Sequence, residues 1–201
     1  MSVPVVEIII FTASEALLAD DSRLNDTTEY LKKADGSISV FHGYQTEDPS
    51  RVYIFIVWKT FEHFEKAIAS ETFPAFRDNF QTHLVGGDFS MRHILFDVNA
   101  ISALSAPITE ICTCTPKEGQ DQSEIDALIH QLQGNTHLFP GVHPSPAWGK
   151  VKQNSEYIFV IGWDSLEAKR SSSKIPWVQE VVEGLVKISE FSVKHVVLHK
   201  A

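Results

Sequence analysis

The chain has 201 residues, of which 43% are hydrophobic and 21% charged, a composition typical of a globular protein rather than a disordered one. Seventeen basic and twenty-six acidic residues give a net charge of -9, so we expect neither nucleic acid nor a membrane surface as a partner. The longest apolar run, residues 53–58, is far shorter than the ~20 residues of a membrane-spanning helix. The opening Met1–Pro4 carries no secretory signal, so we expect a cytoplasmic protein.

The first half of the chain alternates between strand and helix periodicity in the order strand, helix, strand, strand, helix, strand. The two middle strands flank a turn-rich stretch and form a predicted hairpin, and Pro74 interrupts the second helical region. Thr60 is expected to cap that region at its start. The expected strands are Val5–Thr12, Ser37–Gln45, Val52–Trp58 and Phe89–Asp97, with helices inside 14–34 and 61–80.

The second half repeats the first in order and spacing. Pro4–Ile8 corresponds to Pro107–Ile111, Tyr53–Trp58 to Tyr157–Trp163, and Phe89–His93 to Phe191–His195, at offsets of 103, 105 and 102 residues. Ser123 and Ser165 are the expected helix N-caps, and the last strand is expected at Phe191–His199. The small, uncharged residues 99–106 are the predicted linker, so the repeats are expected at 1–98 and 107–201.

This element order predicts an α+β fold made of two ferredoxin-like βαββαβ repeats. A four-stranded sheet with helices on one face leaves its other face bare, and here that face is also apolar. We therefore expect the two sheets to pack on each other as an intramolecular dimeric α/β barrel, either as a monomeric pseudo-dimer or as a homodimer of the whole chain.

Several motifs resemble the dimeric α/β barrel superfamily, in a tandem form of its antibiotic-biosynthesis-monooxygenase-like (ABM-like) branch. The first half carries the resemblance at Phe41–Pro49, at Trp58 followed by Glu62, and at His93–Phe96. The second half carries it more weakly, at Trp148-Gly149, Trp163, Glu167 and His195. The resemblance implies a cofactor-independent monooxygenase or polyketide cyclase, a haem-handling enzyme, or a stress-response protein. Many catalytic relatives have a histidine on the first strand, where this chain has Glu7 and Glu110.

Glu7 and Glu110 are the candidate catalytic bases, because each is a carboxylate inside an apolar strand. In a ferredoxin-like sheet the fourth strand lies beside the first, so His93 and His195 are candidate partners that act as an acid or an oxyanion donor. The structural alternative places both glutamates at solvated strand ends and lets the histidines donate to backbone carbonyls. An axial role for His93 or His195 in haem binding is the third possibility.

The candidate substrate-binding residues are His42, Tyr53, Trp58 and Trp148. His42 and Trp148 stand at matched positions, so the two repeats are not expected to be functionally equivalent. The alternative is that Trp148 fills the core and that Trp58 and Trp163 are packing anchors at strand ends.

No metal site or cofactor is expected. His195 and His199 would lie about 13 Å apart on a strand. Cys112 and Cys114 lack the further ligands of a zinc site and are expected to be reduced thiols. The leading hypothesis is a cofactor-independent enzyme acting on a small aromatic or polyketide-like substrate, and the alternative is a non-catalytic binding scaffold without a cavity of ~300 Å³.

Overall fold

The protein is described here by a computed structural model, which covers residues 4–144 and 146–201. The predicted absence of a signal sequence falls partly on residues 1–3, outside this range. The chain divides into two compact units, residues 1–95 with 198–201 and residues 96–197, and each is described by itself. Among the residues described, no helix is long and apolar enough to span a membrane.

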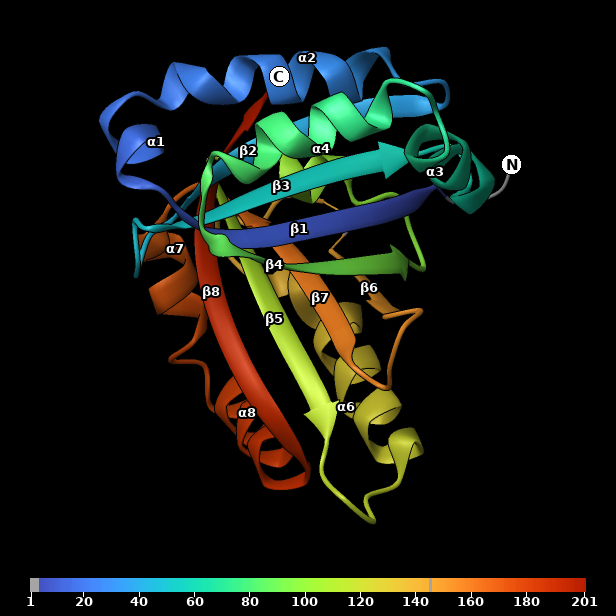
Figure 1. The fold of residues 1–201 in the computed structure, drawn as a ribbon. Coiled ribbons are helices and arrows are strands. Elements are labelled where there is room, and N and C mark those ends of the chain that lie inside the picture. Colours follow the sequence, from blue (N-terminus) through green and yellow to red (C-terminus); the bar gives the residue numbers. More distant parts are fainter. Residues whose placement is uncertain (1–3, 145) are drawn as a thin grey trace. The chain divides into compact units, whose positions relative to one another are not determined.

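The first unit follows the predicted order of strands and helices (Figure 1). The predicted helical region 14–34 is divided by a 3-10 turn, η1, where Asp20 accepts a bond from the Ser22 backbone. The elements are β1 (Val5–Ala13), α1 (Glu15–Ala19), η1 (Asp21–Arg23), α2 (Leu24–Lys33), β2 (Ser37–Gln45), β3 (Arg51–Trp58), α3 (Phe61–Ile68), α4 (Phe73–Gln81) and β4 (Leu84–Leu95).

The strands of this unit are antiparallel neighbours in the order β4-β1-β3-β2, which is the ferredoxin-like order. Alternate residues of β1 point to opposite faces, so Ile9, Phe11 and Ala13 pack with residues of α1, α2 and α4 in one apolar core. Figure 1 shows α2 and α4 over this sheet. Glu7 belongs to the same alternation as Ile9 and therefore faces the helices.

The last strand of the first unit starts earlier than predicted, at Leu84 instead of Phe89. Gly86 and Gly87 both have positive φ, of 67° and 76°, and the β1–β4 register shifts between Phe11 and Ala13. The two glycines look like a loop in the sequence, but they form an irregular start of the strand.

The second unit has the same order after a short helix, α5 (Figure 1). Its strands are antiparallel neighbours in the order β8-β5-β7-β6, which repeats the order of the first unit. The elements are α5 (Ile101–Leu104), β5 (Ile108–Pro116), α6 (Gln122–Asn135), η2 (Thr136–Leu138), β6 (Ala147–Lys150), β7 (Tyr157–Trp163), α7 (Leu166–Ser172), α8 (Pro176–Ile188) and β8 (Ser189–Lys200).

The helix caps agree with the sequence in part. Ser165 caps α7 through a bond from the Ala168 amide to its hydroxyl, as predicted. Ser123 does not cap α6, because Asp121 takes that place and accepts the bond from the Ser123 amide. A carboxylate two residues earlier is the better acceptor for the first amides of the helix.

The predicted linker contains the short helix α5, which packs on β7. The Thr109 hydroxyl donates to the Ala103 carbonyl at 3.0 Å, and Ala103 and Leu104 are fully buried. Gly162 makes this approach possible, because a Cβ atom there would lie 2.7 Å from the Ala106 side chain.

Candidate functional site

Glu7 is a buried carboxyl group that accepts a hydrogen bond from an indole. Trp58 lies opposite Val5 on the β1–β3 pair, so its side chain is diagonal to Glu7 on the same face of the sheet. The Trp58 Nε1–H donates to Glu7 Oε2 at 2.8 Å. Glu7 is only 4% exposed, and burial raises its pKa from 4.5 to about 7, while the bond from Trp58 opposes this shift. The group therefore changes charge near neutral pH.

The second repeat builds the same pair from equivalent residues. Trp163 lies opposite Ile108, and its Nε1–H donates to Oε2 of the buried Glu110 at 2.8 Å. The other oxygen differs between the repeats. Cys112 Sγ donates to Glu110 Oε1 at 3.4 Å, whereas Ile9 occupies the position equivalent to Cys112 and leaves Glu7 Oε1 without a donor among residues 4–144 and 146–201.

The histidines lie beside the glutamates, as the predicted strand order requires. His93 is the direct register partner of Glu7, and His195 is that of Glu110. His195 Nε2 lies 3.9 Å from Glu110 Oε2. In the first repeat, the ring of His93 packs against the rings of Phe64 and Phe61, with ring centroids 4.2 and 5.1 Å apart.

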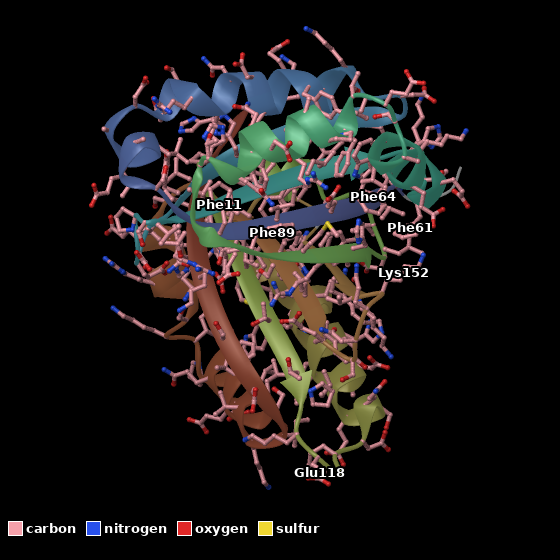
Figure 2. The ribbon with its side chains drawn as sticks, viewed as in Figure 1. Phe11, Phe61, Phe64, Phe89, Glu118 and Lys152 are labelled. Atoms are coloured by element: carbon pink, nitrogen blue, oxygen red, sulfur yellow. The ribbon has the colours of Figure 1, made fainter. Side chains whose placement is uncertain are left out.

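These two phenylalanines of α3 also contact each other, with ring centroids 5.3 Å apart, and Figure 2 shows them together at the end of the first sheet. His93 is 2% exposed. Neither His93 nor His195 is among the residues that line the pockets described below. Each histidine therefore lies beside its glutamate on the neighbouring strand and outside the walls of these pockets.

Glu7 opens into an apolar pocket of about 210 Å³ between the first sheet and its helices. Its walls are aromatic: Tyr30 stacks on Phe76 at 4.2 Å, Phe76 on Phe80 at 6.1 Å, and Phe89 meets Phe80 edge-on at 5.9 Å. The pocket is lined by Glu7, Ile9, Tyr30, Leu31, Ala34, Trp58, Phe64, Ala67, Ile68, Phe73, Phe76, Arg77, Phe80, Gln81, Phe89 and Met91.

A wider and more polar groove of about 390 Å³ adjoins this pocket. The two share Tyr30, Ala34 and Ala67 in their linings. Lys33 and Lys66 contribute positive charge to the groove.

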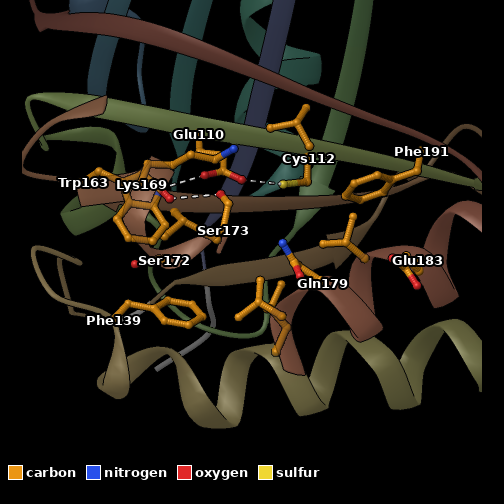
Figure 3. A pocket seen from close by; sticks show the side chains of 15 residues that line it. Glu110, Cys112, Phe139, Trp163, Lys169, Ser172, Ser173, Gln179, Glu183 and Phe191 are labelled. Carbon is orange, nitrogen blue, oxygen red and sulfur yellow. Dashed lines mark hydrogen bonds between the residues drawn. The ribbon is translucent and has the colours of Figure 1, made fainter. Parts of the chain in front are cut away.

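The second repeat has a pocket of about 380 Å³ at the equivalent place (Figure 3). Glu110, Cys112 and Trp163 form one side, and Phe139 and Phe191 contribute aromatic walls. This volume lies above the ~300 Å³ at which ligand pockets usually begin, whereas the pocket of Glu7 alone, at about 210 Å³, lies below it. The pocket also contains Lys169, Ser172, Ser173, Gln179 and Glu183, so it is more polar than the pocket of Glu7.

The remaining predicted site residues lie away from both pockets. His42 of β2 is half-buried near His199, with ring centroids 6.3 Å apart, and burial lowers its pKa. Tyr53 points to the opposite face of the sheet from Glu7 and donates to Gln45 at 3.3 Å. Trp148 packs between Tyr157 and His130. These three residues are not brought together with the glutamates.

The two thiols are free, and both are buried. Burial raises the pKa of Cys112 well above its usual value, so this thiol stays protonated and can act as a donor to Glu110. Within the described part of the chain, no group of three or more His, Cys, Asp or Glu side chains is arranged to hold a metal ion.

The bonds from Trp58 and Trp163 to the glutamates do not follow from the sequence pattern, which predicts only packing anchors at strand ends or ligand-stacking groups. A sequence signal is present, because in both repeats a Trp ends the third strand and a Glu stands two residues after the residue that pairs with this Trp on the first strand. Predicting the bond requires the diagonal contacts between the first and third strands as well as the pairing of the first and fourth strands.

Comparison with known proteins supports the architecture. No protein-family model matches the chain, and no curated protein sequence is similar to it. Solved structures do match over nearly the whole chain. A candidate monooxygenase from Lactobacillus acidophilus NCFM is 15% identical, with a TM-score of 0.68 over 100% of this chain and 96% of its own.

Two further structures agree with this match. A candidate monooxygenase from Fusobacterium nucleatum is 11% identical, with a TM-score of 0.73 over 98% of this chain and 93% of its own. An anthrone oxidase-like protein is 16% identical, with a TM-score of 0.71 over 98% of this chain and 92% of its own. At these identities the matches establish the fold. The chain shares the fold of these full-length structures, and its two βαββαβ repeats confirm the predicted α+β fold class of two ferredoxin-like repeats.

Proposed function

We propose that the chain is a cofactor-independent oxygenase of small aromatic substrates, with Glu7 of the first repeat as its proton-transfer group. The observation that carries the proposal is a carboxyl group with a pKa of about 7, one oxygen held by Trp58 and the other open to an aromatic pocket. A general base works best when its pKa lies near the working pH.

The surroundings of Glu7 favour a planar, apolar substrate. The stacked rings of Tyr30, Phe76 and Phe80 offer flat aromatic surface, and such pairs gain ~0.5–1.5 kcal/mol beyond the area that they bury. The adjoining groove accommodates a substrate longer than the pocket itself. The full-length likeness to an anthrone oxidase-like protein supports a substrate of fused aromatic rings.

The proposed reaction begins with proton abstraction by Glu7. Its carboxylate takes a proton from a CH2 group that lies between aromatic rings opposite a carbonyl, and the electron pair left on carbon delocalises over the rings. Molecular oxygen then oxidises this carbanion. Overall, CH2 and O2 give C=O and water, and Glu7 returns its proton to the reduced oxygen. The apolar walls keep bulk water from quenching the carbanion.

The first repeat is favoured over the second because the Oε1 atoms of the two glutamates have different neighbours. In the second repeat the Cys112 thiol donates to Glu110 Oε1, so both oxygens already have donors. Glu7 Oε1 faces its pocket beside Ile9, which has no polar group to offer. Under this proposal His93 acts behind Glu7, and His42, Tyr53 and Trp148 do not contact the substrate.

Oxygen uptake with anthrone at pH 7 tests the proposal. We expect the wild type to consume oxygen and form anthraquinone faster than a protein-free blank. Glu7→Gln should lose at least ~100-fold in rate, the low end of general-base contributions, because its amide accepts from Trp58 but cannot take a proton. Glu110→Gln is the matched control and should keep most activity. Equal rates for wild type and Glu7→Gln would contradict the proposal and favour the binding-scaffold alternative.

A further inference from the structure

Three neighbouring positions give the two repeats pockets of different chemistry. Helices α3 and α7 begin at equivalent places, each three residues after the tryptophan that ends the preceding strand, Trp58 or Trp163. Counting along each helix, Phe64, Ala67 and Ile68 of the first repeat correspond to Lys169, Ser172 and Ser173 of the second. All six residues line their own pocket. The second repeat thus replaces one apolar wall by an ammonium group and two hydroxyl groups.

Ser172 supplies an observation that packing does not explain. Its side chain is 2% exposed, and its hydroxyl has no hydrogen-bond partner among residues 4–144 and 146–201. A buried hydroxyl without a partner costs free energy. Because Ser172 lines the pocket, a bound molecule can supply the missing partner.

Lys169 gives the same end of the pocket a positive charge. The residue is half-buried and lines the pocket with Ser172, and its backbone carbonyl accepts a bond from the Ser173 hydroxyl at 3.0 Å. Figure 3 shows Lys169, Ser172 and Ser173 at the Trp163 end, with Glu183 and Phe191 at the other end. Glu110 at the same end already accepts hydrogen bonds from Trp163 and Cys112.

The rest of the pocket is built for an aromatic body. Phe139 stacks on Trp163 and on Trp177, with ring centroids 5.8 and 5.5 Å apart. Val178 and Val182 of α8 add apolar surface. Glu183 lies at one end and Glu110 at the other, and of these two ends only the one with Glu110 also carries an ammonium group, Lys169, so charge complementarity orients an anionic ligand toward Lys169.

We propose that the second repeat holds a separate binding site for an aromatic carboxylate, with the carboxylate on Lys169 and Ser172 and the ring between Phe139 and Phe191. This site binds its ligand without proton transfer by Glu110. It does not depend on the reaction proposed for the first repeat.

Calorimetric titration of the full chain with 2-naphthoate and with the neutral 2-naphthamide tests the site. We expect naphthoate to bind at least ~10-fold more tightly than naphthamide, as a charge-assisted bond provides. Lys169→Met should abolish this preference while naphthamide affinity changes little. Ser172→Ala should weaken naphthoate binding several-fold without lowering Tm, because the variant removes a buried hydroxyl that has no partner in the protein.

The matched control is Lys174→Met, which removes an exposed lysine that does not line either pocket and should leave the preference for naphthoate over naphthamide unchanged. Loss of this preference in Lys169→Met alone separates the site from the aromatic pocket of Glu7. Equal affinity for the two probes, binding of neither, or an unchanged preference in Lys169→Met would overturn the proposal.

Discussion

At the scale of single residues, the two buried glutamates differ in the hydrogen bonds that they accept. Each accepts a bond from an indole N–H on Oε2 at 2.8 Å, but the neighbour of Oε1 differs between the two. For Glu7, the cost of burial exceeds what one hydrogen bond restores, so its pKa rises to about 7. A buried acid with one donor and one open oxygen is suited to proton transfer.

The raised pKa of Glu7 predicts an unusual dependence of stability on pH. Between the unfolded value of 4.5 and the folded value of about 7, the folded chain binds the extra proton. The free energy of unfolding contributed by Glu7 should therefore fall as pH rises through this window, by on the order of 3 kcal/mol. Glu7→Gln should lack this fall, so that the variant gains stability relative to the wild type above pH 7.

Urea unfolding between pH 4.5 and 8 measures this difference. Glu65→Gln, at an exposed position of α3, is the control and should follow the wild-type slope. If the wild type and Glu7→Gln have parallel profiles, Glu7 is not a proton-binding group of the folded state near neutral pH.

The sequence predicts part of this site and misses the rest. Glu7 and Glu110 stand out because charged residues inside β-branched strands are rare, and their register with His93 and His195 follows from the strand order. The bonds from Trp58 and Trp163 depend on side-chain direction across a diagonal of the sheet. Strand periodicity carries no information about that direction.

At the scale of elements, the turn between α2 and β2 fixes how α3 meets the first sheet. Gly36 has a φ of 79°, and a Cβ atom built on it would overlap the ring of His63 on α3. The Lys59 amide also donates to the Gly36 carbonyl at 2.8 Å. The turn therefore holds the start of α3, whose Phe64 lines the pocket of Glu7.

Replacing Gly36 tests this packing. Gly36→Ala should lower the free energy of unfolding by about 3 kcal/mol, because left-handed strain adds to the overlap with His63. Gly87→Ala is the matched control: its φ is 76°, and nothing lies within 4 Å of the added Cβ atom. The control should lose only about 1 kcal/mol. If urea unfolding shows equal losses of unfolding free energy for the two variants, the ring of His63 moves aside without cost and the turn does not hold α3.

The bounds of most elements could be predicted, and the exceptions have physical causes. The hairpin strands fall within one residue of the predicted ranges because a polar turn separates two β-branched runs. The start of β4 was not predicted because Gly86 and Gly87 interrupt the strand pattern. The cap of α6 was not predicted because two polar residues near its start, Asp121 and Ser123, can both act as a cap.

At the scale of the whole molecule, the duplication permits the two repeats to diverge. Both keep a Glu and a Trp at the same register, while the residues around them differ. Ile9 and Cys112 occupy equivalent positions beside the glutamates, as do Phe64 and Lys169 on the following helices. The sequence reveals the duplication through its spacing, but the difference in function depends on which side chains share a pocket.

Exchanging the residue beside each glutamate tests this division. Ile9→Cys gives Glu7 Oε1 the donor that Glu110 has, so we expect anthrone oxidation to fall at least ~10-fold, as a charge-assisted bond to the carboxylate lowers its basicity. Cys112→Ile should leave the rate within about twofold, because no proton transfer is assigned to Glu110. Steady-state oxygen uptake, with circular dichroism as a check on folding, distinguishes the two. Comparable losses in both variants would argue against a single active repeat.

The most direct test of the central claim is the pKa of Glu7 itself. Titration of the ¹³C-labelled glutamate carboxyl signals by NMR, with Glu7→Gln to assign the resonance, follows this one group through its change of charge. The account predicts a midpoint at about pH 7. A midpoint at the ordinary value of 4.5 would show that Glu7 is ionised throughout the physiological range, and the proposed proton transfer would lose its physical basis.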